Sequence, residues 1–314
     1  MVYSGGTKVV FKPAGRQRVP AIHGPQHVRS LQWQKTLALI PVLAVASGTA
    51  GWTVLTHAGA CAAAAILAEN AASVLLKKKP AVHDGSSVCY ALLLALVLPA
   101  TLPLWAAGLG AFVMIFFAKE LLGGFGQHPF FPPALGYLFL RVSCPALLQN
   151  FEFAEANNVQ NFLTLFENPA HPDALRALAW FHGGTCAEAS LAAILAGGLF
   201  LVWRGIIYWQ LPFIYLVSLI AIAGGLSPEG WQSALSGPVL LCAFYAMSDS
   251  PSMPMTQNGR RLACAAAGML TAILGASENL HPFAAAAVVS AAAPWLEALT
   301  RPNPRSSRGR SGGR

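Results

Sequence analysis

The amino-acid sequence predicts an all-α integral membrane protein with about ten transmembrane helices and two segments interrupted by glycine and proline. Of its 314 residues, 55% are hydrophobic and 10% are charged, whereas soluble domains carry about 25% charged residues. Several long windows contain no Asp, Glu, Lys or Arg at all. This composition excludes a disordered chain, which needs high charge and low hydrophobicity, and it argues against an ordinary soluble domain.

The first four spans come from two windows that are each too long for one helix. Thr36–Ala68 and Gly85–Ala118 contain no charged side chain, and a helix crosses the hydrocarbon core with about 20 residues. Ser47-Gly48-Thr49 interrupts the first window and Pro99–Pro103 interrupts the second, so each predicts a helical hairpin. The expected helices are 35–51, 55–76, 86–101 and 104–121.

Six further spans complete the membrane domain 35–299. They are expected at 131–149 and, after an outer loop at 150–187, at 188–203, 206–225, 234–248, 262–277 and 283–299. A basic segment, 1–34, precedes the domain. The tail 300–314 is rich in arginine and is expected to be disordered; no aromatic residues alternate with its arginines, so nucleic-acid binding is not expected.

Charge supports this topology. With the N-terminus in the cytoplasm, the inner segments and the span ends that touch them hold all but Arg141 and Arg176 of the 20 Lys and Arg residues. Acidic residues concentrate on the outer side, at Glu152, Glu155, Glu167, Asp173, Glu188, Glu229 and Glu278. Every loop then satisfies the positive-inside rule, and both termini are expected on the cytoplasmic face.

Two segments near the inner face cannot remain regular helix. Residues 119–134 contain three glycines and three prolines within eleven positions, and residues 248–261 combine Asp249 with a proline-rich loop. Such backbone must pack inside the bundle or line a cavity, because its polar groups need partners. A structural turn and the wall of a cofactor or ion site both agree with the first pattern. A capped turn and a second interrupted segment beside the first both agree with the second.

Ionisable residues within spans are functional candidates. Glu69 lies in the second expected span and Arg141 in the fifth. An ion path or cofactor contact would explain them, and so would internal pairing or snorkelling to the membrane surface. The six cysteines are scattered singly and no group has metal-ligand spacing, so no metal site is expected. No nucleophile motif occurs either, and we assign no catalytic residue.

Several stretches, in order along residues 27–302, carry a family resemblance. They include Gly123-Gly124-Phe125-Gly126-Gln127-His128-Pro129-Phe130, Leu92–Pro99, Ala196-Gly197-Gly198-Leu199, Trp209-Gln210-Leu211-Pro212, Ser248-Asp249 and Thr300-Arg301-Pro302. Together they resemble the family that contains the D subunit of the Rnf electron-transport complex and the B subunit of the sodium-translocating NADH:quinone oxidoreductase. The length is closer to the Rnf-type protein.

The resemblance implies a component of a redox-driven, ion-translocating complex in the bacterial inner membrane, with other Rnf-like subunits and the lipid bilayer as partners. In that setting the chain carries electrons through a flavin or scaffolds their path, as part of a translocase rather than as an enzyme alone. We expect FMN or riboflavin to bind non-covalently, with contacts from Gly124, Gly126, Gln127, His128, Asp249 and Asp84. The alternatives are a stand-alone permease for a small solute and a cofactor-free structural subunit.

The chain also departs from the family's pattern. The family attaches FMN to a threonine in an S-G-A-T stretch of the outer loop, and that stretch occurs nowhere in this sequence. The corresponding position falls near Ala179, which has no hydroxyl group, so covalent FMN is not expected. His128 and Phe131 stand where the family has asparagines, and Ser250 stands where it has proline.

Overall fold

The computed structural model describes residues 28–77, 84–148, 191–226, 236–278 and 282–301. The regular elements in these ranges are all helical. They are α1 (Val28–Ala50), α2 (Trp52–Leu75), α3 (Ser86–Val97), α4 (Leu104–Val113), η2 (Met114–Glu120), α5 (Pro132–Ser143), α8 (Leu191–Trp203), α9 (Gln210–Leu226), α10 (Gly237–Leu241), η5 (Cys242–Ala246), η6 (Ser250–Ser252), α11 (Gln257–Glu278) and α12 (Pro282–Thr300).

The helices have the composition of a membrane protein. Within the described ranges, α2 and α12 are long and apolar enough to cross a bilayer, and α3, α8, α9 and the continuous α10–η5 pair are shorter apolar helices. Large apolar side chains also cover the outer surface of the bundle, among them Trp52, Leu67, Phe117, Trp203 and Trp295. An apolar exterior of this extent is unusual for a soluble monomer.

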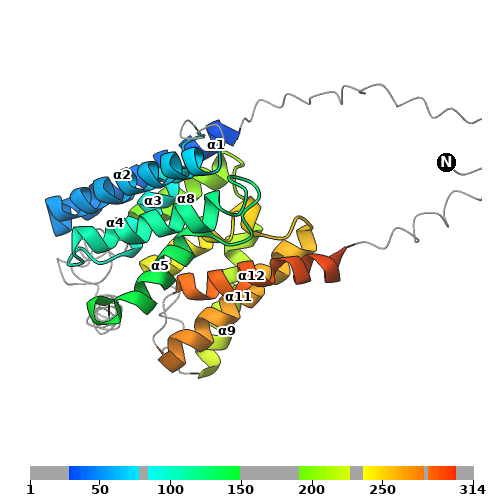
Figure 1. The fold of residues 1–314 in the computed structure, drawn as a ribbon. Coiled ribbons are helices and arrows are strands. Elements are labelled where there is room, and N and C mark those ends of the chain that lie inside the picture. The colour runs from blue at the N-terminus through cyan, green and yellow to red at the C-terminus, as the bar shows by residue number, and fades with distance from the viewer. Residues whose placement is uncertain (1–27, 78–83, 149–190, 227–235, 279–281, 302–314) are drawn as a thin grey trace, which may run out of the picture.

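Helix α3 lies at the centre of the bundle. It packs against α1, α2 and α5, and all of its residues except Val88 and Leu92 are buried. Figure 1 shows α1, α2, α4 and α8 gathered around it, whereas α9, α11 and α12 form a second group. Helix α5 joins the two groups, since it contacts α3 and α4 on one side and α12 on the other.

Each of the ten expected ranges contains a described helix, but several expected boundaries are wrong. Helix α1 begins at Val28 rather than at residue 35, and α11 begins at Gln257 rather than at residue 262. Both expected starts leave out charged side chains that the helices contain: Arg29 lies in the first turn of α1, and Arg260 in α11 donates to the Pro254 carbonyl. Crossing of a membrane by these helices stays a prediction.

Proline shortens two other helices. Helix α3 ends at Val97, before Pro99, and α5 ends at Ser143, before Pro145, whereas the expected ends are residues 101 and 149. The residue that precedes a proline is pushed out of the helical region by a steric clash. The two prolines that end these helices are visible in the sequence. The expected ends follow the length of the charge-free windows instead, and they are therefore too late.

Both interrupted segments begin with a π-helical turn. η2 ends α4 immediately before residues 121–131, and η5 ends α10 immediately before residues 247–256. In the first segment Gly123, Gly124 and Gly126 have φ values of 124°, 96° and 92°, which only glycine adopts easily. π-helical turns occur often at functional sites, so these two segments are candidates for the functional site.

Candidate functional site: two buried charged clusters

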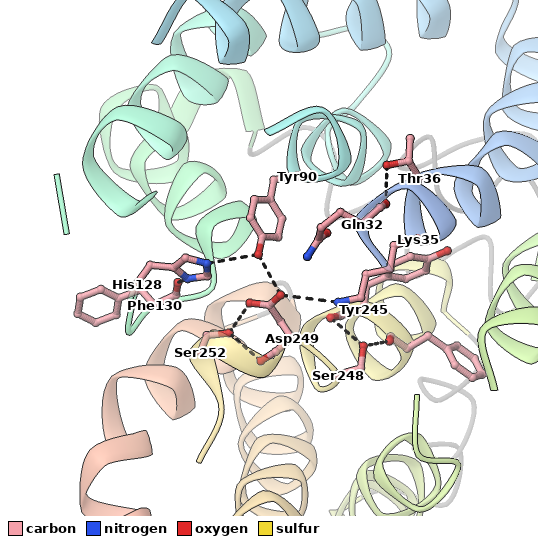
Figure 2. Close-up of polar contacts among 11 residues, drawn as sticks. Gln32, Lys35, Thr36, Tyr90, His128, Phe130, Tyr245, Ser248, Asp249 and Ser252 are labelled. Atoms are coloured by element: carbon pink, nitrogen blue, oxygen red, sulfur yellow. Dashed lines mark hydrogen bonds and ion pairs between the residues drawn. The ribbon is translucent and has the colours of Figure 1, made fainter. Parts of the chain in front are cut away.

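The first cluster surrounds Asp249, which follows η5 and is 1% exposed. Tyr90 on α3 donates its hydroxyl to Asp249 Oδ1 at 2.9 Å, and Ser252 donates to Oδ2 at 2.8 Å. Lys35 Nζ on α1 lies 3.8 Å from Oδ1. Figure 2 shows these groups converging on the carboxylate from separate elements. We call Lys35, Tyr90, His128, Asp249 and Ser252 the Asp249 cluster.

His128 joins this cluster from the first interrupted segment. Its Nδ1 lies 3.0 Å from the Phe130 carbonyl oxygen, which accepts only, so Nδ1 carries a hydrogen. Its Nε2 lies 3.4 Å from the Tyr90 hydroxyl. The ring is fully buried, and this burial lowers the pKa of His128 below its ordinary value, partly offset by the negative charge of Asp249.

Aromatic rings enclose the His128–Tyr90 contact. The Tyr90 ring meets the rings of His128 and Phe131 edge-on, with centroids 5.9 and 6.1 Å apart. Phe125 approaches His128 from the glycine-rich turn at 5.9 Å. Edge-to-face pairs of this kind are favourable beyond the area they bury. They fix the imidazole and phenol orientations on which the hydrogen bonds depend.

The second cluster links α2, α3 and η2. Glu69 Oε1 lies 3.2 Å from Lys119 Nζ, and Ser87 donates to Glu69 Oε2 while accepting from Lys119 Nζ at 2.8 Å. Glu120 Oε1 lies 3.3 Å from the same ammonium group. Lys119 is fully buried, and Glu69 and Glu120 are 1% and 7% exposed. We call these four residues the Glu69 cluster.

Several buried oxygen atoms in and beside the clusters have no hydrogen-bond partner among the described residues. They are Gln32 Oε1 and Tyr245 Oη near the first cluster, Ser86 Oγ beside the second, and Glu120 Oε1, which has only its ion pair with Lys119. Gln32 lies one turn before Lys35 on α1, and Tyr245 lies four residues before Asp249. Unpaired buried polar groups cost about 1–3 kcal/mol each. Their concentration here indicates a site built for more than packing.

Comparison with known proteins agrees with the resemblance noted in the sequence. Residues 16–305 match the model of the NQR2, RnfD, RnfE family. The chain belongs to this family.

Individual relatives match over most of their own length. The D subunit of the Na(+)-translocating ferredoxin:NAD(+) oxidoreductase complex of Acetobacterium woodii is 30% identical over 263 residues, which covers 81% of this chain and 83% of the relative. The D subunit of the ion-translocating oxidoreductase complex of Pseudomonas aeruginosa (strain UCBPP-PA14) is 32% identical over 274 residues, covering 75% and 80%. The protein of the same name from Methanosarcina acetivorans is 28% identical, covering 91% and 94%.

Within this family member, the structure brings together only some of the residues expected to contact a flavin. His128 and Asp249 meet through Tyr90. Gly126 and Gln127 are exposed on the first interrupted segment, Gly124 is half-buried there, and Asp84 is half-buried immediately before α3. Of the expected ion-path residues, Glu69 pairs with Lys119, and Arg141 is half-buried near the end of α5.

The geometry does not fit a flavin cradle made from this chain's expected contacts alone. Both ring nitrogens of His128 and both carboxylate oxygens of Asp249 face other protein groups. The Gly124 and Gln127 amides donate to the Lys119 and Gly124 carbonyls. Contact of these residues with a flavin therefore stays a prediction, and the stretch around Ala179 lies outside the described residues.

Sequence reasoning misses the positive partners of both acidic groups. The charge pattern places Lys35 and Lys119 at the inner membrane boundary, yet both are buried ion-pair partners. No motif points to Tyr90, Ser87 or Ser252 either. The sequence does contain a signal for Lys119 and its neighbour Glu120. These two charged residues lie between an apolar helix and a glycine-rich break, a position that favours burial over exposure in a solvated loop.

Proposed function

We propose that the chain is the D subunit of an Rnf-type ion-translocating oxidoreductase complex in a bacterial inner membrane. In this proposal it spans the membrane ten times, both termini face the cytoplasm, and it works only with the other subunits. Family membership supports the assignment. The observation that carries the site is the pair of buried charged clusters at the two interrupted segments.

The role of the chain in this proposal is to form the ion-handling core beside the electron path. Buried charges are costly unless they are paired and hydrogen-bonded, and ionisable residues within membranes mark ion and proton routes. The Glu69 cluster sets two carboxylates against one ammonium group. The cluster therefore has more acidic than basic groups. An excess of acidic groups suits a site that exchanges a cation with the membrane interior.

A genetic and biochemical experiment tests the assignment. The gene is deleted in its native host, and ferredoxin-dependent NAD+ reduction is measured in inverted membrane vesicles together with ion uptake. We expect both activities to disappear and to return with the wild-type gene. Glu69→Gln should restore the protein in the membrane without restoring ion uptake. Unchanged activity in the deletion strain would overturn the proposal.

A cofactor-free version of the same role is favoured by one specific observation. The side chains of His128 and Asp249 are directed at each other through Tyr90 rather than presented to a ligand. A visible absorption spectrum of the purified native chain separates the two versions. A flavin spectrum supports non-covalent binding, and its absence from a chain that restores activity supports the cofactor-free role.

A further inference from the structure

His128, Tyr90 and Asp249 form a continuous line of polar contacts through the interior. The line runs from His128 Nε2 to Tyr90 Oη over 3.4 Å and from Tyr90 Oη to Asp249 Oδ1 over 2.9 Å. The three residues come from the first interrupted segment, α3 and the second interrupted segment, and they are 0%, 2% and 1% exposed. Figure 2 shows the imidazole, the phenol and the carboxylate in this order.

When His128 is neutral, the two contacts along this line share only one hydrogen atom. His128 Nδ1 already carries its hydrogen toward the Phe130 carbonyl, so a neutral ring has a lone pair at Nε2. Tyr90 has a single hydroxyl hydrogen, and Asp249 takes it. Two lone pairs then face each other between Nε2 and Oη. One added proton on Nε2 turns this contact into a hydrogen bond and completes the line.

We propose that the Asp249 cluster is a proton-binding site in which His128 and Asp249 exchange a proton through Tyr90. A proton bound at His128 Nε2 passes to Tyr90 Oη while the original hydroxyl hydrogen of Tyr90 passes to Asp249 Oδ1. His128 ends neutral, Tyr90 ends neutral and Asp249 ends protonated. One N–H and one O–H bond break, two O–H bonds form, and no electron is transferred.

Charged groups from three elements act on the proton affinity of His128. Asp249 attracts a proton onto His128, whereas Lys35 on α1 and Lys119 on η2 oppose it. Lys35 Nζ also lies 3.8 Å from Asp249 Oδ1. Lys119 is itself held between Glu69 and Glu120. Burial favours the neutral imidazole, which opposes long residence of a proton on His128.

This inference deepens the proposed function, on which it rests for its role, because it assigns a proton as the ion bound between the two interrupted segments. The site itself is a property of the isolated chain. Failure of the chain to join an Rnf-type complex would therefore leave the titration described below unchanged. Failure of the titration would leave membership of the complex unaffected.

The test is a histidine titration on the full-length chain in lipid nanodiscs. The eight histidines are labelled with 15N, and the His128 signals are identified by their loss in His128→Asn, which carries the family's residue at this position. Protonation and tautomer are read by solid-state NMR between pH 5 and 8. Infrared difference spectra follow the protonated carboxyl band of Asp249, identified by its loss in Asp249→Asn.

Tyr90→Phe interrupts the line but keeps the ring, and Tyr215→Phe is its matched control. Tyr215 is also a fully buried tyrosine, and its hydroxyl contacts Thr271, which is not a member of the Asp249 cluster. We expect His128 to be an Nδ1–H tautomer that takes up one proton below pH 6.5 in the wild type. Tyr90→Phe should lower its proton affinity about tenfold, the size of one hydrogen bond to a charged group, and should remove the coupled carboxyl signal. Tyr215→Phe should change neither.

Each other outcome overturns the proposal. A His128 ring that stays neutral wherever the chain is folded has no proton-binding role. An equal titration in Tyr90→Phe and in the wild type means that Tyr90 does not connect the two groups. Replacement of choline by sodium should not shift the titration, and a shift would make the cluster a metal-cation site. If Tyr90→Phe does not fold, the wild-type tautomer and the lower proton affinity expected in Asp249→Asn still decide the question.

Discussion

Ser87 and Tyr90 lie one turn apart on α3, and each donates its hydroxyl to a different buried carboxylate. Ser87 donates to Glu69 and Tyr90 donates to Asp249. The two charged clusters are thus held by one central helix that is buried along almost its whole length. Because α3 is packed on nearly all sides, it holds the two clusters at a fixed separation. A shift of α3 at one cluster therefore also moves the hydroxyl group that contacts the other.

The two adjacent serines at the start of α3 give a sharp comparison. Ser87 bridges Glu69 and Lys119, whereas Ser86 Oγ is buried without a partner among the described residues. Ser87→Ala leaves two charged groups short of a hydrogen bond and should cost about 1–3 kcal/mol of unfolding free energy. Ser86→Ala removes only an unsatisfied hydroxyl and should be neutral or slightly stabilising. Thermal unfolding of the two variants in the same detergent measures the difference, and equal losses would contradict the bridging role of Ser87.

Among the substitutions predicted here, replacement of Lys119 is expected to lower the stability of the fold the most. Lys119→Met leaves Glu69 and Glu120 buried without a counter-charge, and breaking a buried pair in this way costs about 3–5 kcal/mol. Glu69→Gln in the same chain should recover part of the loss, because it removes one of the unpaired charges. Unfolding midpoints of the single and double variants provide the measurement.

Lys77→Met is the matched control for Lys119→Met, because Lys77 is exposed just beyond α2. It should leave the unfolding midpoint unchanged. A loss of stability at Lys77 as large as that at Lys119 would show that lysine removal acts through the membrane surface rather than through the Glu69 cluster.

These clusters also show which features of the fold can be predicted from the sequence and which cannot. Charge-free windows and the distribution of lysine and arginine locate ten helices, because long apolar runs and charged ends are local properties. The pairing of Lys35 with Asp249 joins residues more than two hundred positions apart, and no local pattern encodes it. The same holds for His128 and Asp249, which the sequence marks separately but whose link through Tyr90 depends on the packing of α3.

The π-helical turn η5, which precedes the second interrupted segment, packs against a helix that needs glycine. A Cβ built on Gly198 of α8 would lie 2.6 Å from the Phe244 ring of η5. Gly198→Ala should therefore displace η5 and cost about 1–3 kcal/mol, as overpacking in cores does. Gly224→Ala on α9 is the control, since nothing lies within 4 Å of its added Cβ. Comparable stability of the two variants would mean that Phe244 moves aside without cost.

Acidification should destabilise the fold through His128. Burial holds the pKa of His128 below 6.5 in the folded chain, so the unfolded chain binds more protons in this range. Linkage then requires stability to fall as the pH drops through 6.5 toward the folded pKa. The unfolding midpoint of the wild type should decline over this interval more steeply than that of His128→Asn. Parallel pH profiles would show that the imidazole is not buried in its neutral form.

Covalent flavin should be absent, because ester attachment needs a hydroxyl and the expected position near Ala179 has none. The purified chain should give a dark band under ultraviolet light on a denaturing gel, whatever its native absorption spectrum. The outer loop contains two threonines, Thr164 and Thr185, neither of them in an S-G-A-T context. A fluorescent band would contradict the prediction, and loss of that fluorescence in Thr164→Val or in Thr185→Val would identify the attachment residue. A dark band together with full activity in the membrane would leave electron transfer to a non-covalent flavin or to neighbouring proteins of the complex, and the chain's own chemistry would then be that of its two buried charged clusters.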